Sequence, residues 1–171
     1  MMNDFLTLKS AMPLELTVKR HGLWRPRYEL TDGVHSYGTL RHEGFWRSKS
    51  IIDTAEGNWV ITGKGWSGAE IKNTADQSSA TTSGNLLGTT VTFSAHDGFR
   101  ATFTKPSIWK NTTVWKAEDG TALLSIKSRS FKMPVIYIDV QAQQNRWMLL
   151  LAFLALQIHL TRQRHAAAAA T

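Results

Sequence analysis

The chain has 171 residues, of which 42% are hydrophobic and 19% are charged. This composition indicates one folded domain and excludes a disordered chain. The absence of cysteine excludes disulfides, thiolate metal sites and cysteine nucleophiles. The formal net charge of +7 favours anionic partners such as nucleic acid, phospholipid headgroups or acidic proteins, and it is equally compatible with a role in solubility alone.

The N-terminal segment, residues 1–13, is expected to lead into the first strand without forming a secretory signal. Asp4 and Lys9, followed by Glu15, interrupt any continuous apolar run, and the start is not basic. We therefore expect a cytoplasmic protein, with peripheral contact to the inner face of the membrane left open.

Residues 14–142 have the composition and alternation of β-strands. Leu16 and Val18 are separated by one polar residue, and Ile136 and Ile138 repeat the same pattern. Asp-Gly pairs suited to tight hairpins punctuate the segment at residues 32–33, 97–98 and 119–120. Ten to twelve short strands fit the length. The polar run between Asn73 and Gly88 is expected to form a long surface loop or a weak edge strand.

Residues 143–165 are expected to form one helix, because glycine and proline are absent and leucine, alanine and methionine dominate. Asn145 is a candidate N-cap. From Trp147 to Leu160 the sequence is apolar on nearly all sides, interrupted only by Gln157 and His159. Such a helix must be buried in protein or in lipid. At about 21 Å it is too short to cross roughly 30 Å of hydrocarbon.

The fold predicted for residues 1–171 is a single, mainly β domain. A helix is about 10–12 Å wide with its side chains, so a barrel that encloses one needs more than eight strands. We therefore expect a closed antiparallel β-barrel of ten to twelve strands around the buried C-terminal helix. Residues 166–171 are expected to be a frayed tail.

An internal repeat relates the two ends of the β region. The segment from Tyr28 to Asp53 and the segment from Trp115 to Asp139 share the order aromatic strand, Asp-Gly turn, apolar strand, basic residues and a strand ending in Ile-Asp. Their counterparts lie 86 or 87 residues apart. We interpret the two segments as a duplication.

The strand, the Asp-Gly hairpin, the strand ending in Ile126-Lys-Ser-Arg129, the next strand and the apolar C-terminal helix resemble the tubby-like superfamily. That group includes tubby proteins, phospholipid scramblases and the plant LURP-one-related proteins. The resemblance covers roughly Leu14 to Arg164, although the chain is short for the family. It implies a twelve-stranded barrel around a hydrophobic helix. It also implies that Lys127 and Arg129, which follow an Asp-Gly hairpin, match positions that bind phosphoinositide headgroups.

Two basic clusters are therefore the candidate anionic-ligand sites. The first comprises Lys127, Arg129 and Lys132, and its counterpart in the repeat comprises Arg41, Arg47 and Lys49. Lys127 and Arg129 are expected to share the outer face of a strand, where an arginine offers a phosphate a bidentate fork. An ordinary solvated strand face is the competing interpretation of both clusters.

Other charged and aromatic residues are interpreted as structural. Arg25 and Arg27 flank Pro26 and are expected to be ordinary surface charge. The six histidines show no metal-ligand spacing, and His159 is expected to be either a hydrogen-bonded core histidine or one near the barrel mouth. The seven tryptophans are expected mainly to fill the core.

The motifs of common enzyme classes are missing. Neither a G-x-S-x-G elbow nor a phosphate-binding P-loop occurs, and GKGWSG at residues 63–68 lacks the P-loop spacing. We therefore expect a non-enzymatic protein without a cofactor or a metal.

The sequence leaves several functions open. The first expectation is a monomeric module that binds an anionic phospholipid or phosphoinositide headgroup. The alternative is a structural or protein-interaction module that recruits a partner through exposed strand edges. Nucleic-acid binding and phospholipid scrambling rank lower, and scrambling conflicts with a helix too short to span a bilayer.

Overall fold

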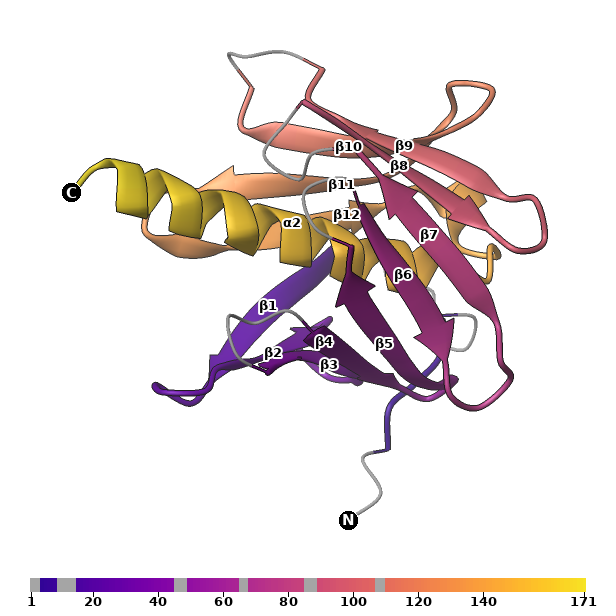
Figure 1. The fold of residues 1–171 in the computed structure, drawn as a ribbon, viewed down its shortest axis with the longest axis horizontal. Helices are drawn as coiled ribbons and strands as arrows, with labels where there is room; N and C mark the ends of the chain where they lie inside the picture. The colour runs from indigo at the N-terminus through magenta and orange to yellow at the C-terminus, as the bar shows by residue number, and fades with distance from the viewer. Residues whose placement is uncertain (1–3, 9–14, 45–48, 65–67, 85–88, 107–109) are drawn as a thin grey trace.

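The structure is a computed structural model that describes residues 4–8, 15–44, 49–64, 68–84, 89–106 and 110–171. It is a closed antiparallel barrel of twelve strands in the order β1-β12-β11-β10-β9-β8-β7-β6-β5-β4-β3-β2, with one long helix, α2, running through it (Figure 1). The strands are β1 (Glu15–His21), β2 (Arg27–Thr31), β3 (Ser36–Glu43), β4 (Lys49–Thr54), β5 (Gly57–Gly63), β6 (Gly68–Asn73), β7 (Ser79–Ser83), β8 (Thr90–Ala95), β9 (Arg100–Thr104), β10 (Thr112–Ala117), β11 (Ala122–Arg129) and β12 (Lys132–Ile138). The predicted fold class is confirmed.

The strands form because alternate side chains point into the barrel and are buried there. Leu16 and Val18 of β1 are buried, as are Leu124 and Ile126 of β11, in agreement with the alternation in the sequence. A short 3-10 helix, η2 (Val140–Ala142), follows β12 and leads toward α2.

Helix α2 (Met148–Ala169) supplies the centre of the core. Its residues from Met148 to Leu156 are all buried, and Phe153 is fully enclosed. Gly38 of β3 faces Phe153, and a Cβ atom at Gly38 would lie 3.1 Å from that ring and 2.5 Å from the backbone oxygen of Asp53. Only glycine therefore lets this strand pass so close to the helix.

The ends of the helix differ from the sequence prediction. Trp147, and not Asn145, is the residue at the N-cap; the Asn145 side chain accepts a hydrogen bond from the Trp147 N–H at 2.9 Å and closes the turn before the helix. At the other end the helix continues to Ala169, so most of the alanines expected to fray are helical. Alanine has the highest helix propensity, which favours this extension.

The polar run between Asn73 and Gly88 contains a central strand of the barrel. Its middle forms β7, which pairs with β6 through Ile71 and Ala80 and with β8 through Thr82 and Phe93. The expectation of a surface loop or an edge strand is therefore wrong for residues 79–83. Small polar side chains are accommodated there because both neighbouring strands satisfy the backbone hydrogen bonds.

The two copies of the repeat form equivalent three-stranded units, β2-β3-β4 and β10-β11-β12. Each begins with an even-numbered strand, so the Asp-Gly turns of both copies lie at one end of the barrel and their basic hairpins lie at the other. This follows because each strand of the barrel runs antiparallel to its two neighbours.

Barrel closure defines two ends. Connections that follow even-numbered strands lie at the end where α2 begins, and connections that follow odd-numbered strands lie at the end where it leaves. In Figure 1 the last turns of α2 leave the barrel on the same side as the β1–β2 hairpin. Within the described ranges, no helix combines the length and hydropathy that a membrane span requires.

The central role of α2 predicts that Phe153→Ala lowers the free energy of unfolding by about 3–5 kcal/mol, because it leaves a cavity where helix and barrel meet. Urea unfolding monitored by circular dichroism measures the change. Gln163→Ala, at an exposed position of the same helix, serves as the control and should change stability by less than about 0.5 kcal/mol. Equal, small effects of both substitutions would contradict the central position of α2.

Candidate functional site

Charge is segregated along the barrel axis. The end where α2 begins, here named the acidic end, carries carboxylates in or beside each of its strand connections. They are Asp32, Glu56, Asp76, Asp97, Glu118, Asp119 and Asp139. Among the described cations, Lys72, Arg100, Lys116 and Arg146 also lie at or near this end. The Arg146 guanidinium pairs with Asp76 at 3.2 Å.

Carboxylates of the acidic end accept hydrogen bonds from backbone N–H groups of the turns in which they lie. Asp32 accepts hydrogen bonds from the N–H groups of Val34 and His35 at 2.9 and 2.7 Å and from the Tyr37 hydroxyl at 2.7 Å. The His35 N–H contributes most to holding the pKa of Asp32 far below its usual range. Asp97 similarly accepts from the Trp147 Nε1–H at 2.9 Å, just before α2. These acids therefore organise turns and the entry of the helix.

The opposite end, here named the basic end, gathers cations in its connections, in the adjoining strand ends and in the later turns of α2. The described cations are Arg20, Arg25, Arg27, Arg41, Lys49, Lys64, Lys105, Lys110, Lys127, Arg129, Lys132, Arg162 and Arg164. By sequence, the segments that connect the strands at this end contain neither aspartate nor glutamate.

The first predicted cluster lies at the end of the β11–β12 hairpin. Lys127, Arg129 and Lys132 are all exposed, and Arg129 is opposite Lys132 in the register. A bulge between Lys127 and Arg129 interrupts the ladder, while Ser128 faces His159 of α2. The two cations therefore lie outside the barrel wall as predicted.

The second predicted cluster is only partly described. Arg41 lies near the end of β3, and Lys49 begins β4 beside Glu43. Arg47 falls outside the described residues. The two clusters share the basic end but do not adjoin, since β1 and β2 lie between β12 and β3 in the barrel order.

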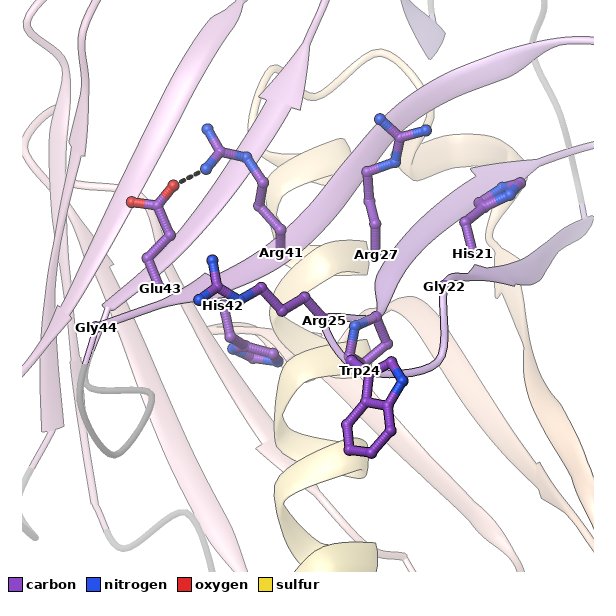
Figure 2. A pocket seen from close by; sticks show the side chains of 10 residues that line it. His21, Gly22, Trp24, Arg25, Arg27, Arg41, His42, Glu43 and Gly44 are labelled. Carbon is purple, nitrogen blue, oxygen red and sulfur yellow. Dashed lines mark ion pairs between the residues drawn. The ribbon is translucent and has the colours of Figure 1, made fainter.

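A groove next to Arg41 is lined by Arg25 and Arg27, which were expected from the sequence to be ordinary surface charge. This arginine groove, with a volume of about 1020 Å³, lies between the β1–β2 hairpin and the end of β3. Its lining residues are His21, Gly22, Trp24, Arg25, Pro26, Arg27, Arg41, His42, Glu43 and Gly44. Figure 2 shows the Arg27 and Arg41 side chains extending in the same direction from neighbouring strands.

The cations of the arginine groove differ in how far acids neutralise them. Arg41 forms ion pairs with Glu43 and with Asp53, and Figure 2 marks the first of these. Arg25 and Arg27 have no ion pair within the described part of the chain. These two guanidinium groups are therefore the ones available to an incoming anion.

The register of the β2–β3 hairpin brings these arginines together, and no local motif in the sequence indicates it. Arg27 lies opposite Arg41 in the β2–β3 ladder, fourteen positions away in the chain. From the sequence, Arg25 and Arg27 are expected to be ordinary surface charge because Pro26 between them marks an edge or a turn. The register of the hairpin, set partly by an irregularity between Leu30 and Thr31, aligns the two arginines.

A second concavity lies where α2 leaves the barrel. This helix-exit pocket has a volume of about 400 Å³. Its lining residues are Thr89, Phe103, Lys105, Asn111, Thr113, Ile126, Ser128, His159, Arg162, Gln163 and Ala166. The Arg162 guanidinium lies over the Phe103 ring, 5.6 Å from its centre, and burial lowers the pKa of both Arg162 and His159.

His159 is half-buried and lines the helix-exit pocket at the barrel mouth, the second of the two positions that the sequence analysis left open for it. Its Nδ1 atom lies 3.4 Å from the Ser128 hydroxyl. Among the described residues, no group of three or more histidine, aspartate or glutamate side chains is arranged to hold a metal ion.

The tryptophans fall into different classes. Trp59, Trp115 and Trp147 are buried and fill the core, as expected. Trp24 is 95% exposed at the tip of the β1–β2 hairpin. The expectation that the tryptophans mainly fill the core is therefore wrong for Trp24. Trp46, Trp66 and Trp109 lie outside the described residues.

No protein-family model, curated protein or solved structure matches this chain.

The hydrogen bonds of the acidic end predict a pH dependence of stability. The folded-state pKa of Asp32 is depressed, so its contribution is present above the unfolded-state value of about 3.9 and is lost as the pH falls toward the folded-state value. We expect Asp32→Asn to lower the free energy of unfolding at pH 7 by about 1–3 kcal/mol. In urea titrations at successively lower pH, the difference from the wild type should shrink.

Glu118→Gln is the matched control, because Glu118 is exposed in a neighbouring turn. It should leave stability within about 0.5 kcal/mol of the wild type. An effect of Asp32→Asn that is independent of pH would contradict a role for the carboxylate charge.

Proposed function

We propose that this protein is a non-enzymatic β-barrel module that binds an anionic phospholipid headgroup at its basic end. The observation that carries the proposal is the separation of charge along the barrel axis, with the carboxylates of the strand connections collected at the opposite end. A face of one sign raises the local concentration of its counter-ion and orients the molecule toward a charged surface.

The arginine groove supports a headgroup phosphate better than the predicted clusters do. It is concave, and Arg25 and Arg27 present guanidinium groups whose planar forks suit phosphate oxygens. Lys127, Arg129 and Lys132 lie on an open strand face and line neither concavity described at this end. In this proposal they contribute to the field of the basic end, and the groove makes the direct contacts.

The resemblance to the tubby-like superfamily agrees with this proposal through the order of its elements. It led us to assign the headgroup contacts to Lys127 and Arg129, whereas the shape of the groove favours Arg25 and Arg27. The two assignments predict different effects of mutation, so one experiment distinguishes them.

The alternative functions fit the barrel less well. Recruitment of a partner through strand edges has less support, because each described strand of the closed barrel has two neighbours. Stacking of single-stranded nucleic acid needs several exposed aromatic side chains on one basic face, and Trp24 and Phe131 are the large aromatic side chains that the described part of the basic end exposes. If the wild type binds neither probe in the experiment below, an acidic protein becomes the favoured partner of the basic end.

We expect the wild type to bind inositol hexakisphosphate, a soluble polyanion, and vesicles that contain phosphatidylserine, with affinities that fall as salt rises. Arg25→Glu combined with Arg27→Glu should weaken both interactions at least about tenfold, since each charge-assisted hydrogen bond contributes about 1.5–3 kcal/mol. Isothermal titration calorimetry and vesicle co-sedimentation measure the two affinities.

Lys116→Glu is the charge-matched control, because Lys116 lies beside the β10–β11 turn at the acidic end. It should leave both affinities within about twofold of the wild type. A wild type that binds neither inositol hexakisphosphate nor phosphatidylserine-containing vesicles would refute the proposed function. A larger loss from Lys127→Glu with Arg129→Glu than from the groove variant would move the headgroup site to β11.

A further inference from the structure

Two hairpin tips at the basic end expose large hydrophobic side chains. In the β1–β2 connection, Leu23 is 84% exposed and Trp24 is 95% exposed. In the β11–β12 connection, Phe131 is fully exposed. Residues of this size normally contribute to a core, and their placement at tips leaves them almost entirely exposed to solvent.

The two tips are neighbours. Strand β1 pairs with β12 in antiparallel fashion, with Thr17 opposite Val135. From that pair, β1 continues to His21 and β12 extends back to Lys132 toward the same end of the barrel. The β1–β2 tip and the β11–β12 tip therefore project from adjacent hairpins at the basic end of the barrel.

The backbone at Phe131 argues against a purely structural role. Its φ angle is +59°, in the left-handed region where a bulky side chain costs about 1 kcal/mol or more and glycine or asparagine is preferred. A hairpin selected for stability alone would place glycine there. The phenylalanine gains no compensating burial, since its side chain is fully exposed.

Cations surround both tips. Arg129 and Lys132 flank Phe131 in the hairpin, and Arg25 follows Trp24 directly. This combination matches the chemistry of a membrane interface, where aromatic side chains enter the headgroup region and cations remain at the anionic phosphates. A soluble acidic protein would satisfy the cations but would also need a complementary apolar pocket.

The remaining connections at this end share the same composition in sequence. The segments that join the other strand pairs here contain no acid and hold large hydrophobic residues. Those residues are Phe45, Trp46, Trp66, Leu86, Leu87, Ile108 and Trp109. They lie outside the described part of the structure, so Leu23, Trp24 and Phe131 are the residues that support an apolar contact at this end.

We propose that the tips carrying Leu23, Trp24 and Phe131 insert into the interfacial region of an anionic phospholipid bilayer. The barrel then docks by its basic end, with its acidic end directed away from the membrane. This inference rests on the proposed function of the same end and adds a hydrophobic contact to it. Electrostatic attraction then directs the barrel to the membrane surface, and burial of the apolar tips stabilises the bound state.

Phe131→Gly provides the sharpest test. We expect it to weaken binding to phosphatidylserine-containing vesicles by about tenfold, because partial burial of a large aromatic side chain is lost. The melting temperature should stay the same or rise, since glycine relieves the left-handed backbone. Binding of inositol hexakisphosphate should be unchanged, because the tip makes no headgroup contact.

Leu23→Ser should also weaken vesicle binding selectively, because Leu23 does not line the arginine groove. Val34→Ser is the matched control, because Val34 is 85% exposed in a turn at the acidic end. Phospholipids brominated in their acyl chains should quench part of the tryptophan fluorescence of the wild type, and Trp24→Phe should remove much of that quenching.

The outcomes separate this inference from the proposed function. Tip variants that bind vesicles as tightly as the wild type, with soluble polyanion binding intact, would overturn insertion and leave headgroup binding standing. If the tip variants lose affinity equally for vesicles and for inositol hexakisphosphate, insertion is also overturned, since the tips would then belong to the headgroup site. A wild type that binds neither probe would overturn both proposals.

Discussion

The structure depends on the enclosure of one helix. Met148 to Leu156 are buried on every side of α2, so no single face can be turned to solvent and no single sheet can cover it. A closed barrel meets this requirement, and twelve strands make it wide enough for a helix. Helix and barrel therefore bury each other, and at Gly38 a strand passes so close to the helix that a side chain would not fit.

Closure has a second consequence, which concerns charge. In a barrel whose neighbouring strands are all antiparallel, every second connection returns to the same end. Acidic turns such as Asp32-Gly33 and Asp119-Gly120 therefore collect at one end, and the basic hairpins at the other. The acidic end uses its charge locally, as in the bonds that Asp32 and Asp97 accept. At the basic end, Arg25 and Arg27 have no such partner within the described residues, and we propose that a headgroup phosphate supplies it.

Much of the fold could be predicted from the sequence because it depends on local patterns. Alternation at Leu16 and Val18 and the uniform apolarity of α2 are properties of single segments. The prediction was wrong where tertiary pairing overrides local composition. The polar residues 79–83 form a central strand because β6 and β8 satisfy their backbone groups, and the terminal alanines extend α2 to Ala169.

The candidate site was less predictable, since it depends on which distant residues share one end. The sequence by itself determined that an apolar helix too short for a bilayer must be enclosed by strands, because hydrophobic periodicity is written along the chain. Only the tertiary structure decided that Arg27 lies opposite Arg41 and that the tips with Trp24 and Phe131 are neighbours. Register and closure bring these residues together, and both arise from hydrogen bonds between strands far apart in the chain.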